Sequence, residues 1–169
     1  MARTKTSARR SAARKPVAKS RAKTARPAAK RPVAQAKAAS PKARAQFFRV
    51  SHHSEDDFDG GLRRYAKYRD LGMAKATGGL VQAHVIRFVP PFRAEEVSKL
   101  HYHDVEFQMV YVLKGWIKTE IDGQGEILMR AGSAWIQPPR VEHVVLDYSG
   151  DCEVLEVILP ADFETVELE

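Results

Sequence analysis

Short runs of apolar and β-branched residues follow one another along the second half of the chain, separated by turns that contain glycine or proline. Residues 80–89 are expected to form a strand, with every second side chain on the same face, and Pro90-Pro91 ends that run. Residues 116–121 lead into Asp122-Gly123, a pair typical of hairpin turns. Further strands are expected at residues 106–114, 126–129, 133–137, 142–148 and 153–159. Regularly spaced short strands without intervening helices predict an all-β, antiparallel sandwich or barrel.

The residues before this series carry weaker signals. Phe47-Phe48-Arg49-Val50 is expected to open the folded part. Ser54 is a helix N-cap candidate followed by three acidic residues, which predicts a short helical piece there. The spacing of apolar residues over 62–69 predicts at most a short amphipathic helical turn.

Residues 1–46 have a different composition from the rest of the chain. They hold fifteen of the 28 lysines and arginines, fifteen alanines and none of the 21 acidic residues. They contain too few large apolar side chains to offset the conformational entropy lost on folding. We therefore expect a disordered basic tail at 1–46, followed by one folded domain at 47–169.

Clustered lysine and arginine without acidic residues is typical of segments that contact polyanions. Non-specific nucleic-acid binding is therefore one expected role of residues 1–46. A transit peptide, a solubilising extension and a mis-assigned translation start are the alternatives.

Several classes of protein are disfavoured. The sequence has no run of about 18 apolar residues, so no membrane-spanning helix is expected. The N-terminus lacks the apolar region of a secretory signal. The single cysteine, Cys152, cannot form an internal disulfide, which favours a reducing, cytoplasmic location.

His101-Tyr102-His103 carries the first sign of chemistry. On a strand, residues two positions apart face the same way, so both imidazoles can converge on one ion. Neutral imidazole suits Zn, Fe, Ni and Cu. Taken alone, such a pair is more often part of a strand surface or a polar core than a metal site.

The spacing downstream resembles the two motifs of the cupin family. The matching positions of the first motif are His101, His103, Gln108 and Gly115, and those of the second are Gly132, Pro138 and His143. The match covers about residues 80–160, and residues 68–72 and 77–79 resemble the lead-in of small bacterial single-domain cupins. The resemblance implies an antiparallel double-stranded β-helix, also called a jelly roll. It also implies one divalent metal ion (Fe, Mn, Ni or Zn) held by His101, His103, Gln108 and His143.

Some positions depart from the family pattern. Gln108 replaces the family's glutamate, and Arg140 replaces a glycine of the second motif. A glutamine binds a metal through its neutral carbonyl oxygen, so three histidines and Gln108 would leave the ion its full charge. Glu106 is a rival carboxylate ligand at a spacing outside the motif. An odd separation between His103 and Gln108 requires a kink before both can face inward, which we place at Asp104-Val105.

Two functions follow from the resemblance. The first is a small-molecule enzyme, either a dioxygenase or an isomerase or ring-opening enzyme acting on a sugar acid or a similar oxygenated substrate. Its general base would be Glu106, Glu142 or His84. Arg140 would bind a substrate carboxylate or, more simply, form a surface ion pair with Glu142. The second is a non-catalytic module that binds a small ligand and whose basic tail contacts nucleic acid. The family also implies a homodimer.

Overall fold

The structure is a computed structural model that describes residues 44–60 and 63–168. Residues 1–43 of the predicted tail lie outside this range, so the boundary at residue 46 and a nucleic-acid role stay predictions. Within the described range, the α-helices cover only four residues each, and none has the length or hydropathy to cross a bilayer.

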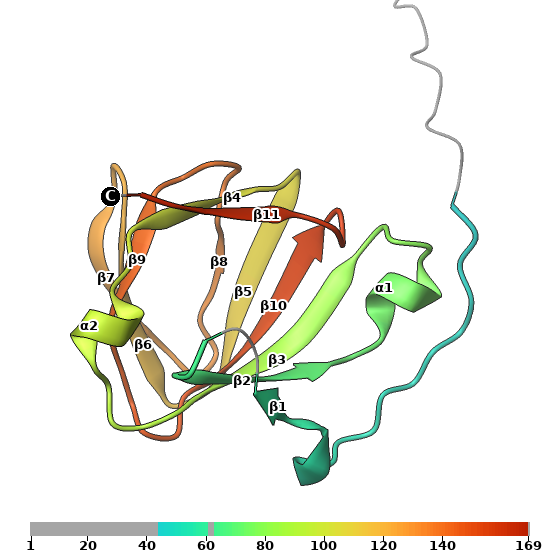
Figure 1. Cartoon of the computed structure of the whole chain (residues 1–169), viewed down its shortest axis with the longest axis horizontal. Coiled ribbons are helices and arrows are strands. Elements are labelled where there is room, and N and C mark those ends of the chain that lie inside the picture. Colours follow the sequence, from blue (N-terminus) through green and yellow to red (C-terminus); the bar gives the residue numbers. More distant parts are fainter. Residues whose placement is uncertain (1–43, 61–62, 169) are drawn as a thin grey trace, which may run out of the picture. The chain divides into compact units, whose positions relative to one another are not determined.

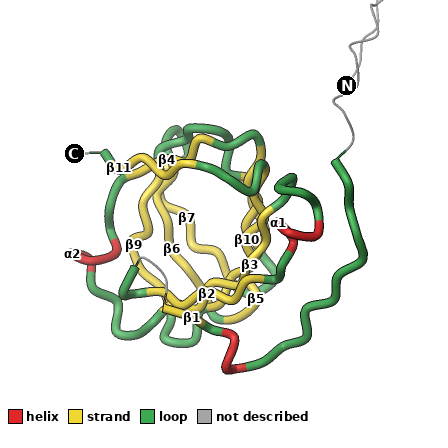
Figure 2. The backbone as a smooth tube through the Cα atoms, turned by 45° about the vertical axis from the view of Figure 1, so that its right-hand side comes forward, coloured by secondary structure: helices red, strands yellow, loops and turns green. Residues whose placement is uncertain are grey.

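Eleven strands make up about half of the described chain. They are β1 (Asp59–Gly60), β2 (Ala66–Asp70), β3 (Gln82–Phe88), β4 (His101–Asp104), β5 (Phe107–Lys114), β6 (Trp116–Ile121), β7 (Gly125–Arg130), β8 (Ala134–Ile136), β9 (His143–Tyr148), β10 (Glu153–Leu159) and β11 (Glu164–Glu167). One sheet has the order β1-β2-β3-β10-β5-β8 and the other β11-β4-β9-β6-β7, with antiparallel pairing throughout (Figure 1). Figure 2 shows the sheets curving round a common interior. The predicted antiparallel jelly roll is confirmed.

The predicted strand bounds are most accurate where apolar and polar residues alternate and a turn follows. β6 and β10 have the predicted bounds, because glycine or turn residues mark both of their ends. At most a short helical turn was expected within residues 62–69, and for residues 66–69 this is wrong. Ala66 pairs with Phe88 and Asp70 with His84, so sheet pairing decides the conformation of β2.

Short helices occupy some of the connections. They are the 3-10 helix η1 (Glu55–Asp57) and the α-helices α1 (Met73–Ala76) and α2 (Ala94–Val97). The Ser54 side chain accepts a hydrogen bond from the backbone of Asp56 and caps η1 as predicted. The expected start of the fold at Phe47 and Phe48 forms no regular element, and both side chains are exposed.

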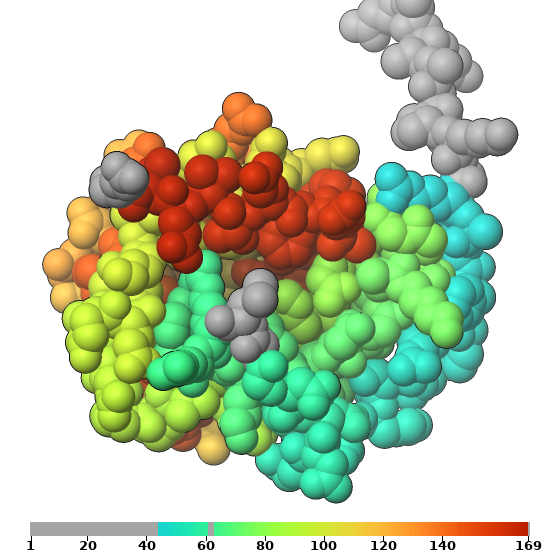
Figure 3. Space-filling model, viewed as in Figure 1, coloured from blue at the N-terminus to red at the C-terminus, as the bar shows by residue number. Residues whose placement is uncertain are grey.

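The hydrophobic core lies between the two sheets. β5 contributes Val110 and Val112, β6 contributes Ile117, and β10 contributes Val154, all of them buried. Part of the interior is a cavity, lined by apolar residues together with a cluster of polar side chains. In Figure 3 the C-terminal part of the chain, in red, forms the upper edge of the face shown.

A break between β4 and β5 brings residues of both strands to the interior. β4 ends at Asp104, and β5 begins at Phe107, with Val105 buried between them. This is where we placed the kink that the odd spacing between His103 and Gln108 requires. The change of direction also moves the chain from one sheet to the other.

Gly115 joins β5 to β6 in the left-handed region, with φ +66°. A Cβ atom there would lie 2.1 Å from Ser149 Oγ and 3.1 Å from Cys152 Cα. Ser149 cannot move away freely, because its Oγ accepts a hydrogen bond from the backbone of Trp116. We expect Gly115→Ala to lower the free energy of unfolding by more than about 1 kcal/mol, measured by urea denaturation.

Gly123→Ala is the matched control for this prediction. Gly123 has φ +73°, and a Cβ atom there would meet nothing within 4 Å. It therefore reports the cost of the backbone conformation alone. Equal losses of stability in the two variants would refute the steric part of the argument.

Candidate metal centre

Three histidines converge inside the barrel. His101 and His103 lie on β4, and His143 lies on β9, where it is the register partner of His101. One ring nitrogen from each of them lies within 4.8 Å of the others. The ring centroids of His101 and His143 are 4.2 Å apart. The structure thus brings together the three histidines at the motif positions.

Hydrogen bonds on the outer side orient these rings. The Nδ1 atoms of His101 and His143 lie 2.7 Å from the Lys99 carbonyl and 2.9 Å from the Val141 carbonyl, respectively. A carbonyl only accepts, so each Nδ1 carries the proton and each Nε2 keeps its lone pair. His103 Nδ1 is hydrogen-bonded to the Thr165 hydroxyl at 2.9 Å. All three rings are therefore held in an orientation suited to metal binding.

The histidines are neutral at pH 7. Burial disfavours the charged imidazolium and lowers the pKa of each of His101, His103 and His143 to about 4. The positive charge of Arg63 lowers each pKa further. A metal binding here would not have to displace protons from the rings.

The predicted fourth ligand, Gln108, lies on β5 and is 1% exposed. Its Nε2 donates to Glu156 Oε1 at 2.6 Å. Because a carboxylate only accepts, this bond sets the orientation of the amide. Gln108 Oε1 then points to the side where Gln137 Nε2 lies, 3.4 Å away. Gln137 Nε2 also contacts His143, so it links the Gln108 carbonyl to the histidines, and Gln108 itself does not line the cavity.

Gln137, which follows β8, was not identified from the sequence. Its Nε2 donates to His143 Nε2 at 2.6 Å, and its Oε1 accepts from the indole of Trp135 at 3.2 Å. An indole N–H only donates, so the Gln137 amide presents N–H rather than oxygen to the histidines. Gln137 is therefore a hydrogen-bond donor at this centre and is poorly placed to be a ligand.

Glu156 on β10 is the second residue that sequence reasoning missed. Its Oε2 lies 2.6 Å from His84 Nε2, and its other oxygen binds Gln108. Burial acts to raise the pKa of Glu156, but these hydrogen bonds and the His84 charge outweigh it and leave the pKa below its usual value. The sequence could have indicated it, because Glu156 lies two residues from Val154 and from Ile158, which face inward on the same strand.

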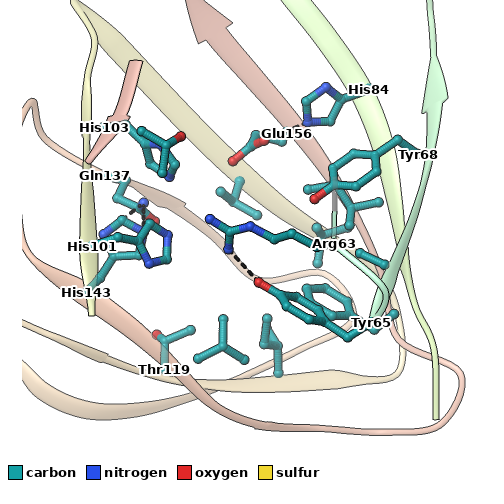
Figure 4. A pocket seen from close by; sticks show the side chains of 18 of the residues that line it. Arg63, Tyr65, Tyr68, His84, His101, His103, Thr119, Gln137, His143 and Glu156 are labelled. Atoms are coloured by element: carbon teal, nitrogen blue, oxygen red, sulfur yellow. Dashed lines mark hydrogen bonds and ion pairs between the residues drawn. The ribbon is translucent and has the colours of Figure 1, made fainter. Parts of the chain in front are cut away.

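A cavity of about 700 Å³ opens in front of the histidines. His84, Glu156 and Tyr68 line it on the side away from β4, and the Arg63 guanidinium lies between them and the histidines (Figure 4). The rest of its wall is mainly aromatic and aliphatic. Those residues are Ala66, Ile86, Phe88, Val110, Ile117, Trp135, Val145, Val154 and Phe163.

Thr119 also lines the cavity. Its side chain is buried, and within the described part of the chain its hydroxyl has no hydrogen-bond partner. A buried hydroxyl without a partner costs free energy, and this oxygen is too buried to be contacted from the cavity.

Of the other predicted site residues, only His84 lies in the cavity. Glu106 and Glu142 are exposed and do not line the cavity, whereas the third candidate base, His84, does. Arg140 is also exposed and outside the cavity. Its guanidinium pairs in a bidentate manner with Asp104, at 3.0 and 2.9 Å, rather than with Glu142.

Comparison with known proteins agrees with this architecture. A family model described as a cupin domain matches residues 92–158, which contain β4 to β9 and most of β10. No curated protein matches the chain. The match lies within the region of about 80–160 where the motif spacing was found.

Solved structures share the fold at low identity. Polyketide cyclase RemF from Streptomyces resistomycificus has a TM-score of 0.57 and 17% identity, over 71% of this chain and 86% of that one. Oxalate decarboxylase from Lactobacillus farciminis has a TM-score of 0.53 and 16% identity, over 67% of this chain and 34% of that one. Salicylate 1,2-dioxygenase from Pseudaminobacter salicylatoxidans has a TM-score of 0.52 and 8% identity, over 64% of this chain and 32% of that one. This chain thus spans about a third of the latter two proteins.

The motif positions, the two-sheet barrel and the family match all point to one assignment. The histidines of the motif meet in the barrel, and the match covers most of the strands that build it. Residues 92–158 are therefore identified as a cupin domain within this antiparallel barrel.

Proposed function

We propose that this protein is a metal-dependent cupin that acts on a small molecule bound in its cavity. The observation that carries the proposal is the convergence of three histidines, two buried and one partly buried, at the wall of a cavity of about 700 Å³. Three imidazoles and one oxygen donor suit a single divalent ion such as Fe, Mn, Ni or Zn. The proposed ligands are His101, His103, His143 and Gln108.

The donor set fits such an ion. The histidines are neutral, their outer nitrogens are hydrogen-bonded, and Gln108 has its amide nitrogen engaged by Glu156. The Gln137 amide donates to His143 Nε2, so metal binding requires this hydrogen bond to be given up. Freed from His143, the same N–H group would be placed to donate to an oxygen of a bound molecule.

The reaction class follows from the chemistry that a bound ion and the side chains near it would supply. A bound divalent ion with neutral ligands would supply Lewis acidity and, if redox-active, a site for oxygen chemistry. This suits a dioxygenase, or an isomerase or ring-opening enzyme. Of the three candidate bases, His84 is the one in the cavity, and Glu156 holds its ring by the 2.6 Å hydrogen bond. We assign His84 the role of moving a proton to or from the substrate.

Metal content tests this proposal most directly. The full chain is purified without a histidine tag or chelator and analysed by elemental mass spectrometry. We expect close to one divalent ion per chain, and rebinding of one ion after chelation. A redox-active metal would favour the dioxygenase, and Zn the isomerase or ring-opening enzyme. Protein that is metal-free and takes up none of Fe, Mn, Ni or Zn would contradict the proposal. A non-catalytic ligand-binding module would then explain the cavity better.

A further inference from the structure

Arg63 places a permanent positive charge inside the cavity. Its side chain is only 26% exposed, and Figure 4 shows it extending across the cavity toward the histidines. The guanidinium donates from Nη1 to the Tyr65 hydroxyl and lies over the Tyr65 ring, with Cζ 5.8 Å from the centroid. These contacts hold the group in one position without neutralising it.

Little negative charge compensates Arg63 within the described chain. The ion-pair partner found there is Glu167, whose carboxylate is 62% exposed and lies 3.9 Å from Nη2, beyond hydrogen-bond distance. Glu156 also faces the cavity, but its two oxygens are taken by His84 and Gln108. The donors of Arg63 that point away from Tyr65 remain open to a planar acceptor such as a carboxylate.

The remaining wall selects against a strongly hydroxylated molecule. Many of its polar groups already bind one another: His84 with Glu156, and Gln137 with Trp135 and His143. The surfaces between them are aromatic or aliphatic. Each hydroxyl of a sugar acid buried there would need a partner, and leaving one without a partner costs about 1–3 kcal/mol.

We infer that the cavity takes a small carboxylate with an apolar body, whose carboxylate binds Arg63 while a second oxygen faces the histidines. The inference rests on the proposed function in that a small molecule occupies this cavity. It narrows the substrate class from oxygenated compounds in general to apolar hydroxy or oxo acids. Arg63 is then the specificity-determining residue.

Binding of three probes to the full chain tests this inference. Mandelate has a carboxylate, a hydroxyl and a phenyl ring; mandelamide is its neutral counterpart; galacturonate is a sugar acid. Dissociation constants are measured by calorimetry, with quenching of tryptophan fluorescence as a second readout, since Trp135 lines the cavity. We expect mandelate to bind most tightly. Arg63→Gln should weaken mandelate at least about tenfold, the loss of one charge-assisted interaction.

Two controls make the result specific. Arg64 is the exposed neighbour that does not line the main cavity, so Arg64→Gln should leave mandelate affinity within about twofold, the scale of a surface change without a defined role. Mandelamide affinity should be unchanged in Arg63→Gln, which shows that the cavity is intact. Equal affinity of wild type for mandelate and mandelamide, no effect of Arg63→Gln, tighter binding of galacturonate, or no mandelate binding would each overturn the inference.

The measurements are made on both metal-free and Zn-loaded protein, with Zn content determined separately. Zn is redox-inert, so the probes bind without oxidation. Arg63-dependent mandelate binding by a chain that takes up no metal would support the inference while contradicting the proposed function. Uptake of one Zn per chain, with mandelate binding that does not depend on Arg63, would support the proposed function and contradict the inference.

Discussion

Replacing His101 or His143 with alanine is expected to abolish stoichiometric metal binding. Each variant removes one of three imidazole donors that lie within 4.8 Å of one another. The loss of an outer-shell partner alone typically weakens metal affinity by about 10–100-fold, and the loss of a direct donor should exceed this. Competition with a chelator of known affinity, followed by elemental analysis, measures the effect.

Two further variants separate ligands from bystanders. Glu106→Gln should retain most of the metal, because Glu106 is exposed and lies outside the cavity wall. His53→Ala removes an exposed histidine that contacts Glu55, and it should behave like the wild type. Loss of metal in Glu106→Gln, with binding retained in His101→Ala, would refute the ligand assignment.

The metal-free protein is expected to lose stability as the pH falls from about 6.5 toward about 4. In the folded state the pKa of each clustered histidine is about 4, against 6.5 for an ordinary imidazole. Between these values the unfolded chain binds protons that the folded chain does not, so the free energy of unfolding decreases. Each histidine contributes at most about 1.4 kcal/mol per pH unit. Urea denaturation at a series of pH values gives the slope.

A histidine variant tests the origin of this slope. In metal-free His101→Gln, one titrating group is removed, so the slope between pH 6.5 and 4 should be shallower than in the wild type. Below about 4 the contribution of the histidines should end, since both states are then protonated. Stability that is constant from pH 7 to pH 5 would show that the rings are protonated as easily in the fold as in the unfolded chain.

Local patterns were sufficient for much of the barrel. Alternation and turn residues predicted β6 and β10 with their observed bounds. The same approach failed for β2, where an apparent helical spacing around Ala66 gave way to pairing with β3. β11 was also missed, since Glu164–Glu167 has little apolar character and exists as a strand through its pairing with β4. Strands of this kind are specified by their neighbours rather than by their own residues.

The histidine cluster divides in the same way. His101 and His103 face one side of β4 because their spacing matches the two-residue period of a strand, which the sequence alone determines. Their meeting with His143 was expected only from the motif resemblance, since about forty residues separate them in the chain. The pairing of β4 with β9 places His143 opposite His101.

The sequence by itself determined the all-β class, most of the strands and the histidines that can hold a metal. Only the tertiary structure decided which other side chains surround them. Glu156 reaches Gln108 and His84 because β10 lies between β5 and β3, and Gln137 reaches His143 from the end of β8. Arg63 enters the cavity from the chain just before β2. The physical reason is that periodicity fixes the face of a strand on which a residue lies, whereas the order and register of pairing fix what that face meets.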